Sequence, residues 1–215
     1  MIKIAPSLLS CDFTKMGEEL VDIENKGADW AHLDVMDGVF VDNITFGIPV
    51  IASLRRASNI FFDVHLMIVN PIRYVGKFAS AGADMITVHL EACEDVKATL
   101  DAIRSTGKKV GISIKPGTPK EIVYPYLSDV DMVLVMTVEP GHGGQAMIPE
   151  CVEKVTAIRQ KAKEEGYNLL IQVDGGVNAQ TAHKVIEAGA DVLVAGSYVF
   201  AAQDRKLAIE TLRNA

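Results

Sequence analysis

The chain has 215 residues, of which 49% are hydrophobic and 23% are charged, and its formal net charge at pH 7 is −7. A chain of this length can fill the core of one domain but is short for two, so we expect a single domain over residues 1–215. The acidic balance argues against a surface for nucleic acid or anionic membranes, because both require clustered Lys and Arg. It leaves open a small anionic substrate bound in a local pocket.

The N-terminal segment, the cysteines and the apolar runs predict a cytoplasmic protein. Residues 1–6 lack the long apolar stretch of a signal peptide. Cys11, Cys93 and Cys151 are odd in number, far apart and without metal-type spacing, as expected of free thiols in a reducing compartment. The longest apolar run, around residues 132–138, is too short to cross a bilayer.

Short apolar segments alternate with longer amphipathic segments along the whole chain. In chain order, each predicted strand and its following helix are 2–6 and 14–25, 30–34 and 50–57, 61–66 and 71–81, 85–89 and 95–105, 110–114 and 120–127, 132–136 and 149–165, 169–174 and 179–188, and 192–195 and 206–213. The sequence therefore predicts eight strand–helix units.

Three predicted helices end in the same Gly-Ala-Asp sequence, at residues 27–29, 82–84 and 189–191. A glycine there suits the left-handed residue that ends many helices, and the next strand begins directly afterwards. Repeated units with nearly continuous apolar strands indicate a parallel sheet covered by helices. Eight units in this length favour an α/β fold with a single closed (β/α)8 TIM barrel. The alternative, an open flavodoxin-like sheet, leaves two or three strands unused.

Acidic and imidazole side chains gather at the predicted strand ends, where such barrels carry their chemistry. His32 and Asp34 are two apart on one strand and so point to the same side. His65 ends the next strand, and Asp174 comes from across the barrel. Two imidazoles and two carboxylates suit one divalent ion such as Zn²⁺, Fe²⁺, Mn²⁺ or Co²⁺. The alternative is that each His is a hydrogen-bonded core residue and each Asp a helix cap.

Glycines follow the last three predicted strands, and backbone N–H groups in such loops can approach an anion closely. We expect them to form a phosphate pocket, although tight turns alone would also explain them. The residues are Gly141, His142, Gly143, Gly144, Gly175, Gly176, Gly196 and Ser197. Ser7 either binds substrate or caps a turn. Met36, Met67 and Met136 at other strand ends either line the pocket or belong to the core.

These residues resemble the ribulose-phosphate 3-epimerase family over essentially the whole chain. The matching motifs, in family order and spacing, are residues 4–7 (Ile-Ala-Pro-Ser), 32–38 (His-Leu-Asp-Val-Met-Asp-Gly), 43–47 (Asn-Ile-Thr-Phe-Gly), 63–67 (Asp-Val-His-Leu-Met), 136–138 (Met-Thr-Val), 143–145 (Gly-Gly-Gln), 173–177 (Val-Asp-Gly-Gly-Val) and 195–197 (Ala-Gly-Ser). An ordered set of this kind is far more specific than any single motif.

The resemblance implies interconversion of D-ribulose 5-phosphate and D-xylulose 5-phosphate in the pentose phosphate pathway, by a homo-oligomer (dimer or hexamer). It implies that His32, Asp34, His65 and Asp174 ligate the metal, and that Asp34 and Asp174 are the acid/base pair. It also implies that Ser7 and His65 contact the sugar and that the loop glycines with Gly196 and Ser197 hold the phosphate.

The expected chemistry fits the residues. The C3 proton lies next to the C2 ketone, so its removal gives an enediolate whose charge a metal bound through the C2 and C3 oxygens would stabilise. Inversion at C3 needs one carboxylate on each face, which Asp34 and Asp174 can supply. No organic cofactor is required.

Five residues depart from what the family usually has. Val39 and Asp42 replace a polar or basic residue and a Pro in one loop, His142 replaces a Phe, and Lys115 and Glu139 stand where many members have Asn. Because the last two follow adjacent predicted strands, we expect a Lys115–Glu139 ion pair across the rim.

These departures keep a second substrate open, a hexulose phosphate such as D-allulose 6-phosphate. Decarboxylases of similar barrel type are disfavoured because Met36 stands where they have a Lys. A non-catalytic sugar-phosphate sensor is disfavoured because both acid/base carboxylates are present.

Overall fold

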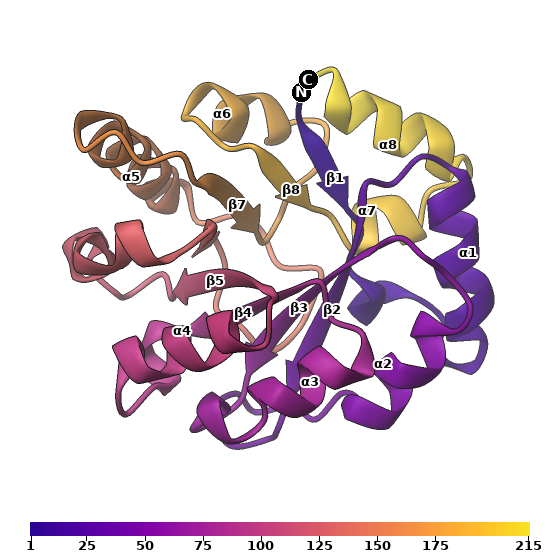
Figure 1. Ribbon diagram of the computed structural model, residues 1–215. Helices are drawn as coiled ribbons and strands as arrows, with labels where there is room; N and C mark the ends of the chain where they lie inside the picture. The colour runs from indigo at the N-terminus through magenta and orange to yellow at the C-terminus, as the bar shows by residue number, and fades with distance from the viewer.

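A computed structural model describes all 215 residues and shows a barrel of parallel strands wrapped by helices (Figure 1). The strands are β1 (Lys3–Ala5), β2 (Trp30–Met36), β3 (Phe61–Met67), β4 (Met85–His89), β5 (Lys109–Ile114), β6 (Met132–Met136), β7 (Leu170–Asp174) and β8 (Val192–Val194). They form one eight-stranded sheet in the order β1-β8-β7-β6-β5-β4-β3-β2.

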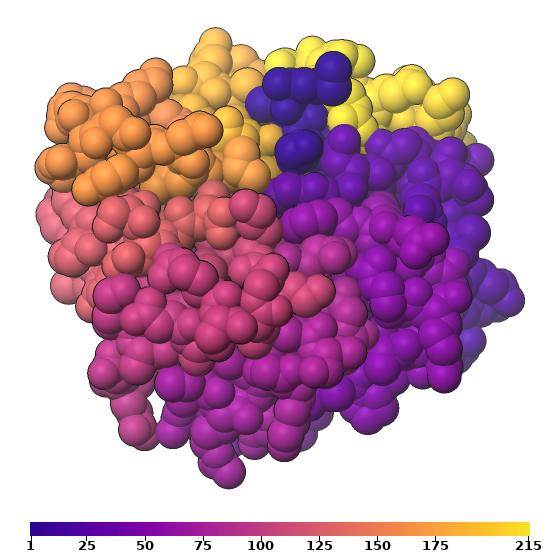
Figure 2. Space-filling view, in the orientation of Figure 1, coloured from indigo at the N-terminus to yellow at the C-terminus, as the bar shows by residue number.

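The two strands at the ends of that order, β1 and β2, also meet and nearly close the barrel. Ser7 and His32 form an isolated parallel bridge, and His32 N donates to Pro6 O at 3.0 Å. The two chain termini consequently lie side by side, and the colours of Figure 2 follow one another around the molecule until indigo meets yellow. The predicted (β/α)8 barrel is confirmed, and the open-sheet alternative is wrong.

Helices connect successive strands, and several begin with a short 3₁₀ turn, labelled η. The helices are η1 (Leu8–Ser10), η2 (Phe13–Lys15), α1 (Met16–Asn25), α2 (Ile48–Arg55), η3 (Pro71–Arg73), α3 (Val75–Ala81), η4 (Leu90–Ala92), α4 (Val96–Ser105), η5 (Lys120–Asp129), η6 (Pro149–Cys151), α5 (Val152–Glu164), α6 (Ala182–Glu187), α7 (Ser197–Phe200) and α8 (Arg205–Arg213). None of them has the length and apolar character needed to span a membrane.

Two connections differ from the prediction. The segment expected as an α-helix at residues 120–127 is the 3₁₀ helix η5, which contains Pro125. A proline has no amide hydrogen and opposes a regular α-helix at that point. The short helix α7, directly after β8, was not predicted; it places Ser197 at the mouth of the barrel.

The barrel interior changes from apolar to polar along the strand direction. Near the strand starts, a small apolar cluster fills the barrel, with Trp30 stacked on Phe61 at 4.6 Å between ring centroids. Further along β2, His32 and Asp34 take the same inward direction as Trp30, because alternate residues of a strand share a side. A separate cluster of 47 buried apolar residues packs the strands against the helices. The fold thus holds the polar groups on a dry apolar base.

At the N-terminal rim, one arrangement recurs before each even-numbered strand. An aspartate stands there and accepts a hydrogen bond from a backbone N–H of the preceding odd-numbered strand, at 2.8 Å in every case. The pairs are Asp29 with Ile4, Asp84 with Phe62, Asp131 with Val110 and Asp191 with Ile171. We name these four arrangements the rim clamps, and each ties two adjacent strand starts together.

Three rim clamps also contain an arginine, and these are the three with the Gly-Ala-Asp sequence. Arg213, Arg55 and Arg159 bind Asp29, Asp84 and Asp191 respectively, together with the carbonyl oxygen of the nearby glycine. Those glycines, Gly27, Gly82 and Gly189, have φ of 92°, 111° and 111°, which confirms the predicted left-handed conformation. In the fourth clamp Asp131 binds Lys109 at 2.6 Å, and the lysine side chain is 61% exposed.

Candidate active site

Four side chains meet at the C-terminal mouth of the barrel, where a ligand atom of each lies within 4.8 Å of the others: His32, Asp34, His65 and Asp174. Asp34 Oδ1 lies 3.2 Å from His32 Nε2 and 3.0 Å from His65 Nδ1. Asp174 Oδ2 lies 3.8 and 4.0 Å from the same two nitrogens. The structure therefore brings together the four residues predicted as metal ligands.

The geometry of these groups fits a divalent metal ion. His32 Nε2 is fully buried and makes no hydrogen bond, although it points toward the two carboxylates. A buried nitrogen without a partner is costly unless something accepts its lone pair. Two imidazole nitrogens and two carboxylate oxygens form a donor set that suits zinc and neighbouring transition metals.

His32 is oriented from behind by a buried carboxylate. Its Nδ1 donates to Asp63 Oδ2 at 2.7 Å, and Gln172 Nε2 donates to the same oxygen at 2.5 Å. The Asp63 contact assigns the hydrogen to Nδ1 and leaves the Nε2 lone pair facing the site. Our sequence analysis gave neither partner a role, although Asp63 stands two residues before His65 and so shares its inward side.

The surroundings of Asp34 and Asp174 shift the pKa values of the two carboxyl groups in opposite directions. Burial would raise the pKa of Asp34, but the nearby His32 and His65 lower it well below its usual value. For Asp174, burial and then the negative charge of Asp34 raise the pKa from 3.8 to about 6. One carboxylate therefore favours the ionised form and the other favours holding a proton.

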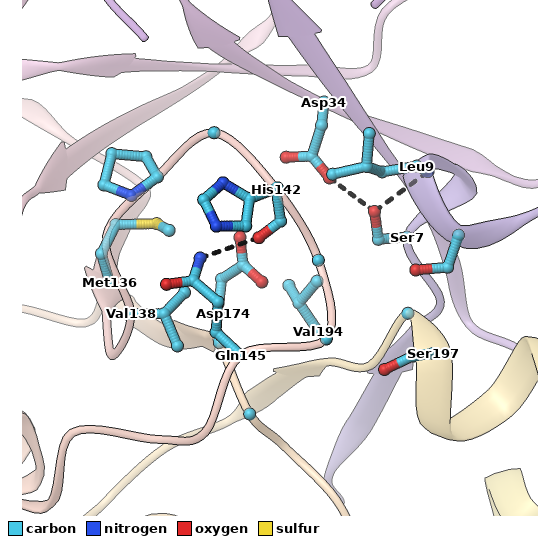
Figure 3. A pocket seen from close by; sticks show the side chains of 18 of the residues that line it. Ser7, Leu9, Asp34, Met136, Val138, His142, Gln145, Asp174, Val194 and Ser197 are labelled. Atoms are coloured by element: carbon cyan, nitrogen blue, oxygen red, sulfur yellow. Dashed lines mark hydrogen bonds between the residues drawn. The ribbon is translucent and has the colours of Figure 1, made fainter. Parts of the chain in front are cut away.

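Ser7 holds the ionised member of the pair. Its Oγ donates to Asp34 Oδ2 at 2.5 Å and also accepts a hydrogen bond from Leu9 N at 3.2 Å, which starts η1 (Figure 3). The two roles that the sequence left open for Ser7 therefore coexist, since it caps a turn while it faces the site.

These groups lie at the base of a pocket of about 570 Å³ that includes its open mouth. Of the predicted site residues, those that line it are Ser7, Asp34, Met36, Met67, Met136, Gly141, His142, Gly143, Gly144, Asp174, Gly175, Gly176, Gly196 and Ser197, while His32 and His65 lie beneath. The lining contains three carboxylates, Asp34, Glu139 and Asp174, and no lysine or arginine.

The loop after β6 arches over this pocket, and the His142 ring points into it (Figure 3). Gln145 Nε2 braces the arch by donating to Glu139 O at 2.7 Å and to His142 O at 2.8 Å. Asn43, from the loop after β2, donates to Gly141 O at 2.8 Å. The two loops that border the mouth are thus joined to each other.

Glycine is required where this arch meets the loop after β7. Gly176 has φ of 66°, and a Cβ there would come within 2.3 Å of the backbone nitrogen of Met147. The close approach lets backbone groups, rather than side chains, form this wall of the pocket.

Comparison with known proteins gives the family. The sequence model of the ribulose-phosphate 3-epimerase family matches residues 3–200. The chain belongs to this family. The resemblance seen in the motifs is therefore confirmed, and the chain is an enzyme of this group of epimerases.

Curated relatives agree over nearly the whole chain. Ribulose-phosphate 3-epimerase of Bacillus subtilis is 49% identical over 99% of this chain and 99% of its own. The Treponema pallidum enzyme is 48% identical over 95% of this chain and 94% of its own. The chloroplastic ribulose-5-phosphate-3-epimerase of Arabidopsis thaliana is 46% identical over 99% of this chain and 76% of its own.

Solved structures of more distant sequence share the barrel. KGPDC from Streptococcus mutans superposes with a TM-score of 0.74 at 14% identity, over 100% of this chain and 96% of that one. A 3-hexulose-6-phosphate synthase gives 0.68 at 19% identity, over 99% and 98%. At such identities the likeness shows the fold alone.

One departure from the family pattern behaves differently from our expectation. No ion pair joins Lys115 and Glu139, so that prediction is wrong. The Lys115 ammonium lies instead 3.8 Å from the centroid of the Phe40 ring, in the loop after β2. A cation over an aromatic face gains electrostatic stabilisation without a carboxylate.

The histidine that ends β4 also contributes to the site. His89, to which the sequence analysis gave no role, is fully buried and contacts His65 with its Nε2 at 2.9 Å. Burial lowers the pKa of His89 to about 4, so its imidazole is neutral near pH 7. Its place at a strand end beside His65 was the signal in the sequence that pointed to it.

Proposed function

We propose that this chain, as one catalytic domain over residues 1–215, interconverts D-ribulose 5-phosphate and D-xylulose 5-phosphate by inverting C3. The observation that carries the proposal is the pair Asp34 and Asp174, which come from β2 and β7 and converge on one pocket with opposite shifts of pKa. Such a pair supplies a base and an acid at the same pH.

In this proposal the ionised Asp34 removes the C3 proton, which the C2 ketone acidifies, and the electron pair of the broken C3–H bond moves toward the C2 oxygen to form an enediolate. Asp174, which holds a proton, returns it to C3 from the other face. The C3 centre is thereby inverted, and Asp34 ends protonated while Asp174 ends ionised. The reverse reaction uses the same groups with their roles exchanged. Ser7, which donates to Asp34 Oδ2, favours the ionised form of that base.

A divalent metal ion held by His32, Asp34, His65 and Asp174 would supply Lewis-acid stabilisation of the negative charge that develops on the sugar oxygens. The unpartnered His32 Nε2 and the mixed donor set support this cofactor. Zn²⁺, Fe²⁺, Mn²⁺ and Co²⁺ all match the donors.

The phosphate end of the substrate would lie against Gly143, Gly144, Gly175, Gly176 and the Gly196–Ser197 turn, which line the other side of the pocket. Because that lining has no lysine or arginine, backbone N–H groups must provide most of the hydrogen bonds to the anion. His142 contributes the one imidazole of the lining. Met36, Met67 and Met136 would give the sugar an apolar floor that excludes water.

Proton exchange in deuterated water tests the reaction. Protein loaded with metal is given D-ribulose 5-phosphate and D-allulose 6-phosphate separately, and C3 is followed by NMR. We expect the pentulose to give its epimer with deuterium at C3, and the Asp34→Asn variant to form neither epimer nor exchanged substrate. Turnover of the hexulose alone would move the chain to the alternative epimerase. No exchange with either sugar would contradict the proposed reaction.

We further propose a cytoplasmic homo-oligomer, dimer or hexamer, that acts in the pentose phosphate pathway. Exposed apolar side chains at the mouth, such as Val39 and Ile44, which are 73% and 75% exposed, support an association between copies. Light scattering on the purified chain measures the subunit number, and a monomer at micromolar concentration would contradict it.

A further inference from the structure

A buried series of hydrogen-bonding side chains extends from His65 away from the pocket. We name the series His65, His89 and Glu91 the relay. His65 turns Nδ1 toward Asp34 Oδ1 at 3.0 Å and Nε2 toward His89 Nε2 at 2.9 Å. His89 turns its other nitrogen, Nδ1, toward Glu91 Oε2 at 3.3 Å. Both imidazoles are fully buried, so water does not reach the bonds between them.

The far end of the relay, Glu91, is held by a backbone N–H and a hydroxyl group. Glu91 Oε1 accepts from the Lys115 N–H at 2.7 Å and from the Thr118 hydroxyl. The loop that carries these donors is itself held by Lys154, whose ammonium donates to the carbonyl oxygens of Lys115, Pro116 and Thr118 at 3.1, 2.5 and 2.6 Å. The Glu91 carboxylate is therefore surrounded by donors, and a carboxylate can only accept.

The anchored Glu91 carboxylate decides the direction of each hydrogen bond in the relay. Because Glu91 accepts, His89 Nδ1 must carry the hydrogen, and its Nε2 then has a free lone pair. That lone pair requires a hydrogen on His65 Nε2, since one of two facing nitrogens must donate. The hydrogen on Nε2 leaves His65 Nδ1 with the lone pair, on the side of the metal site.

We propose that His89 and Glu91 are positioning residues that fix the hydrogen of His65 on Nε2 and so present its Nδ1 lone pair to the metal ion. This inference rests on the metal site proposed above. It gives the two imidazole ligands different supports, since His32 donates directly to the Asp63 carboxylate while His65 reaches a carboxylate through a second imidazole.

The alternative arrangement of hydrogens shows why the relay is needed. A hydrogen on His65 Nδ1 would make a good bond to Asp34 Oδ1, 3.0 Å away, and this form cannot bind a metal through Nδ1. The lone pair on His89 Nε2 opposes this form, because it requires a hydrogen on His65 Nε2. In a Glu91→Gln variant, the amide oxygen would stay with the Lys115 N–H and the amide nitrogen would face His89. Donation from that nitrogen reverses both imidazoles and returns the hydrogen to His65 Nδ1.

The surroundings keep the relay dry. The Phe40 ring lies 4.8 Å from the His89 ring, between centroids, and the Lys115 ammonium covers the outer face of Phe40 at 3.8 Å. Phe40 belongs to the loop after β2, which also borders the pocket, and Lys115 directly follows β5. A dry relay holds its direction because no water can accept or donate in place of His89.

Metal affinity, measured by competition with a chelator, tests the proposal on four variants. His89→Leu removes the acceptor and Glu91→Gln reverses the relay; for both we expect Zn²⁺ to bind about 10- to 100-fold more weakly. His89→Gln can still accept from His65 through its amide oxygen and should restore most of the affinity. Lys115→Met keeps the backbone N–H and the packing on Phe40, and should bind as the wild type does.

A second measurement reports the hydrogens directly. Nitrogen-15 NMR of histidine-labelled, zinc-loaded protein should show His65 metallated at Nδ1 and protonated at Nε2, and circular dichroism should show that the variants remain folded. Wild-type affinity in both His89→Leu and Glu91→Gln would overturn the relay and leave the metal site intact. Equal weakening in His89→Gln and His89→Leu would also overturn it, because packing alone would then be responsible. Failure of the wild type to bind Zn²⁺ would overturn the proposed site and the relay with it.

Discussion

Aspartates stand at both ends of the barrel, but their partners differ between the N-terminal rim and the C-terminal mouth. At the N-terminal rim, four aspartates repeat one arrangement, and each binds a backbone N–H of the neighbouring strand and a cationic side chain. At the C-terminal mouth, Asp34 and Asp174 have no lysine or arginine, and they face two histidines and each other. At the rim each carboxylate has a hydrogen-bond donor and a cationic partner. At the mouth the two carboxylates lie close to each other without such a partner.

This difference separates stability from chemistry within one fold. A carboxylate with a cation and a backbone donor stays ionised and contributes to the folded state, so the rim repeats the arrangement wherever two strand starts must be joined. Burial and a second carboxylate nearby both make the ionised form of Asp174 costly, and that cost is the source of its raised pKa. Removing a carboxylate should therefore have opposite effects on stability at the two ends, and three measurements test this contrast.

The largest expected effect is on catalysis at the mouth. Asp174→Asn removes the proposed acid and should lower kcat for epimerisation by about 10²- to 10⁴-fold, the usual contribution of general acid–base catalysis. Because Asp34 remains, the variant should still exchange the substrate C3 hydrogen with deuterated water, without inversion. The measurement is epimer formation and deuterium uptake by NMR at saturating metal. Epimerisation at the wild-type rate would show that Asp174 is not the acid.

The same variant should affect stability in the opposite direction. The pKa of Asp174 is raised from 3.8 to about 6 in the folded chain, so the folded state binds the extra proton between these values. The favourable contribution of the protonated group is fully present below about pH 4 and is lost as the pH rises through 6. At pH 8 the cost of the ionised group is roughly 3 kcal/mol, at about 1.4 kcal/mol for each pKa unit.

With a chelator present, Asp174→Asn should consequently unfold at higher denaturant concentration than the wild type at pH 8, and at nearly the same concentration at pH 4. Urea unfolding at both pH values measures this, and Asp191→Asn at the rim serves as the matched control. The control should lose stability at pH 8, because its ionised carboxylate binds Arg159 and the Ile171 N–H. A loss at pH 8 in both variants would contradict the contrast between the two ends.

Much of the mouth could be predicted because a parallel barrel gathers its strand ends. β4 and β6 have the predicted bounds, and the inward side of His32 and Asp34 follows from their spacing of two. Residues whose importance depends on a distant partner were missed. Gln172 lies 109 positions from Asp63, and no local pattern indicates that their side chains meet inside the barrel.

Side-chain direction explains the other misses. Lys115 and Glu139 follow adjacent strands, but strand order fixes only where each backbone lies, and the lysine turns toward the Phe40 ring. At the rim, the sequence showed three Gly-Ala-Asp segments and correctly predicted left-handed glycines. It could not show the arginines, because Arg213 is 184 positions from Asp29 and Arg55 is 29 from Asp84.

The smallest expected effect lies in the rim, where the clamps are unequal. Arg159 binds Asp191 and two backbone carbonyls, those of Leu169 and Gly189, and its side chain is 18% exposed. Arg159→Ala should lower the free energy of unfolding by about 1 to 2 kcal/mol, since hydrogen bonds to a charged group that is partly buried are worth more than surface pairs.

Lys109, in the fourth clamp, is 61% exposed and binds only Asp131, so Lys109→Ala should cost less than about 1 kcal/mol. Both variants should keep the wild-type kcat at 25 °C, because neither residue lies near the pocket. Urea unfolding and steady-state kinetics on the same preparations measure the two effects together. A drop in kcat without a loss of stability in Arg159→Ala would mean that the rim shapes the mouth, and that the two ends of this barrel are not independent.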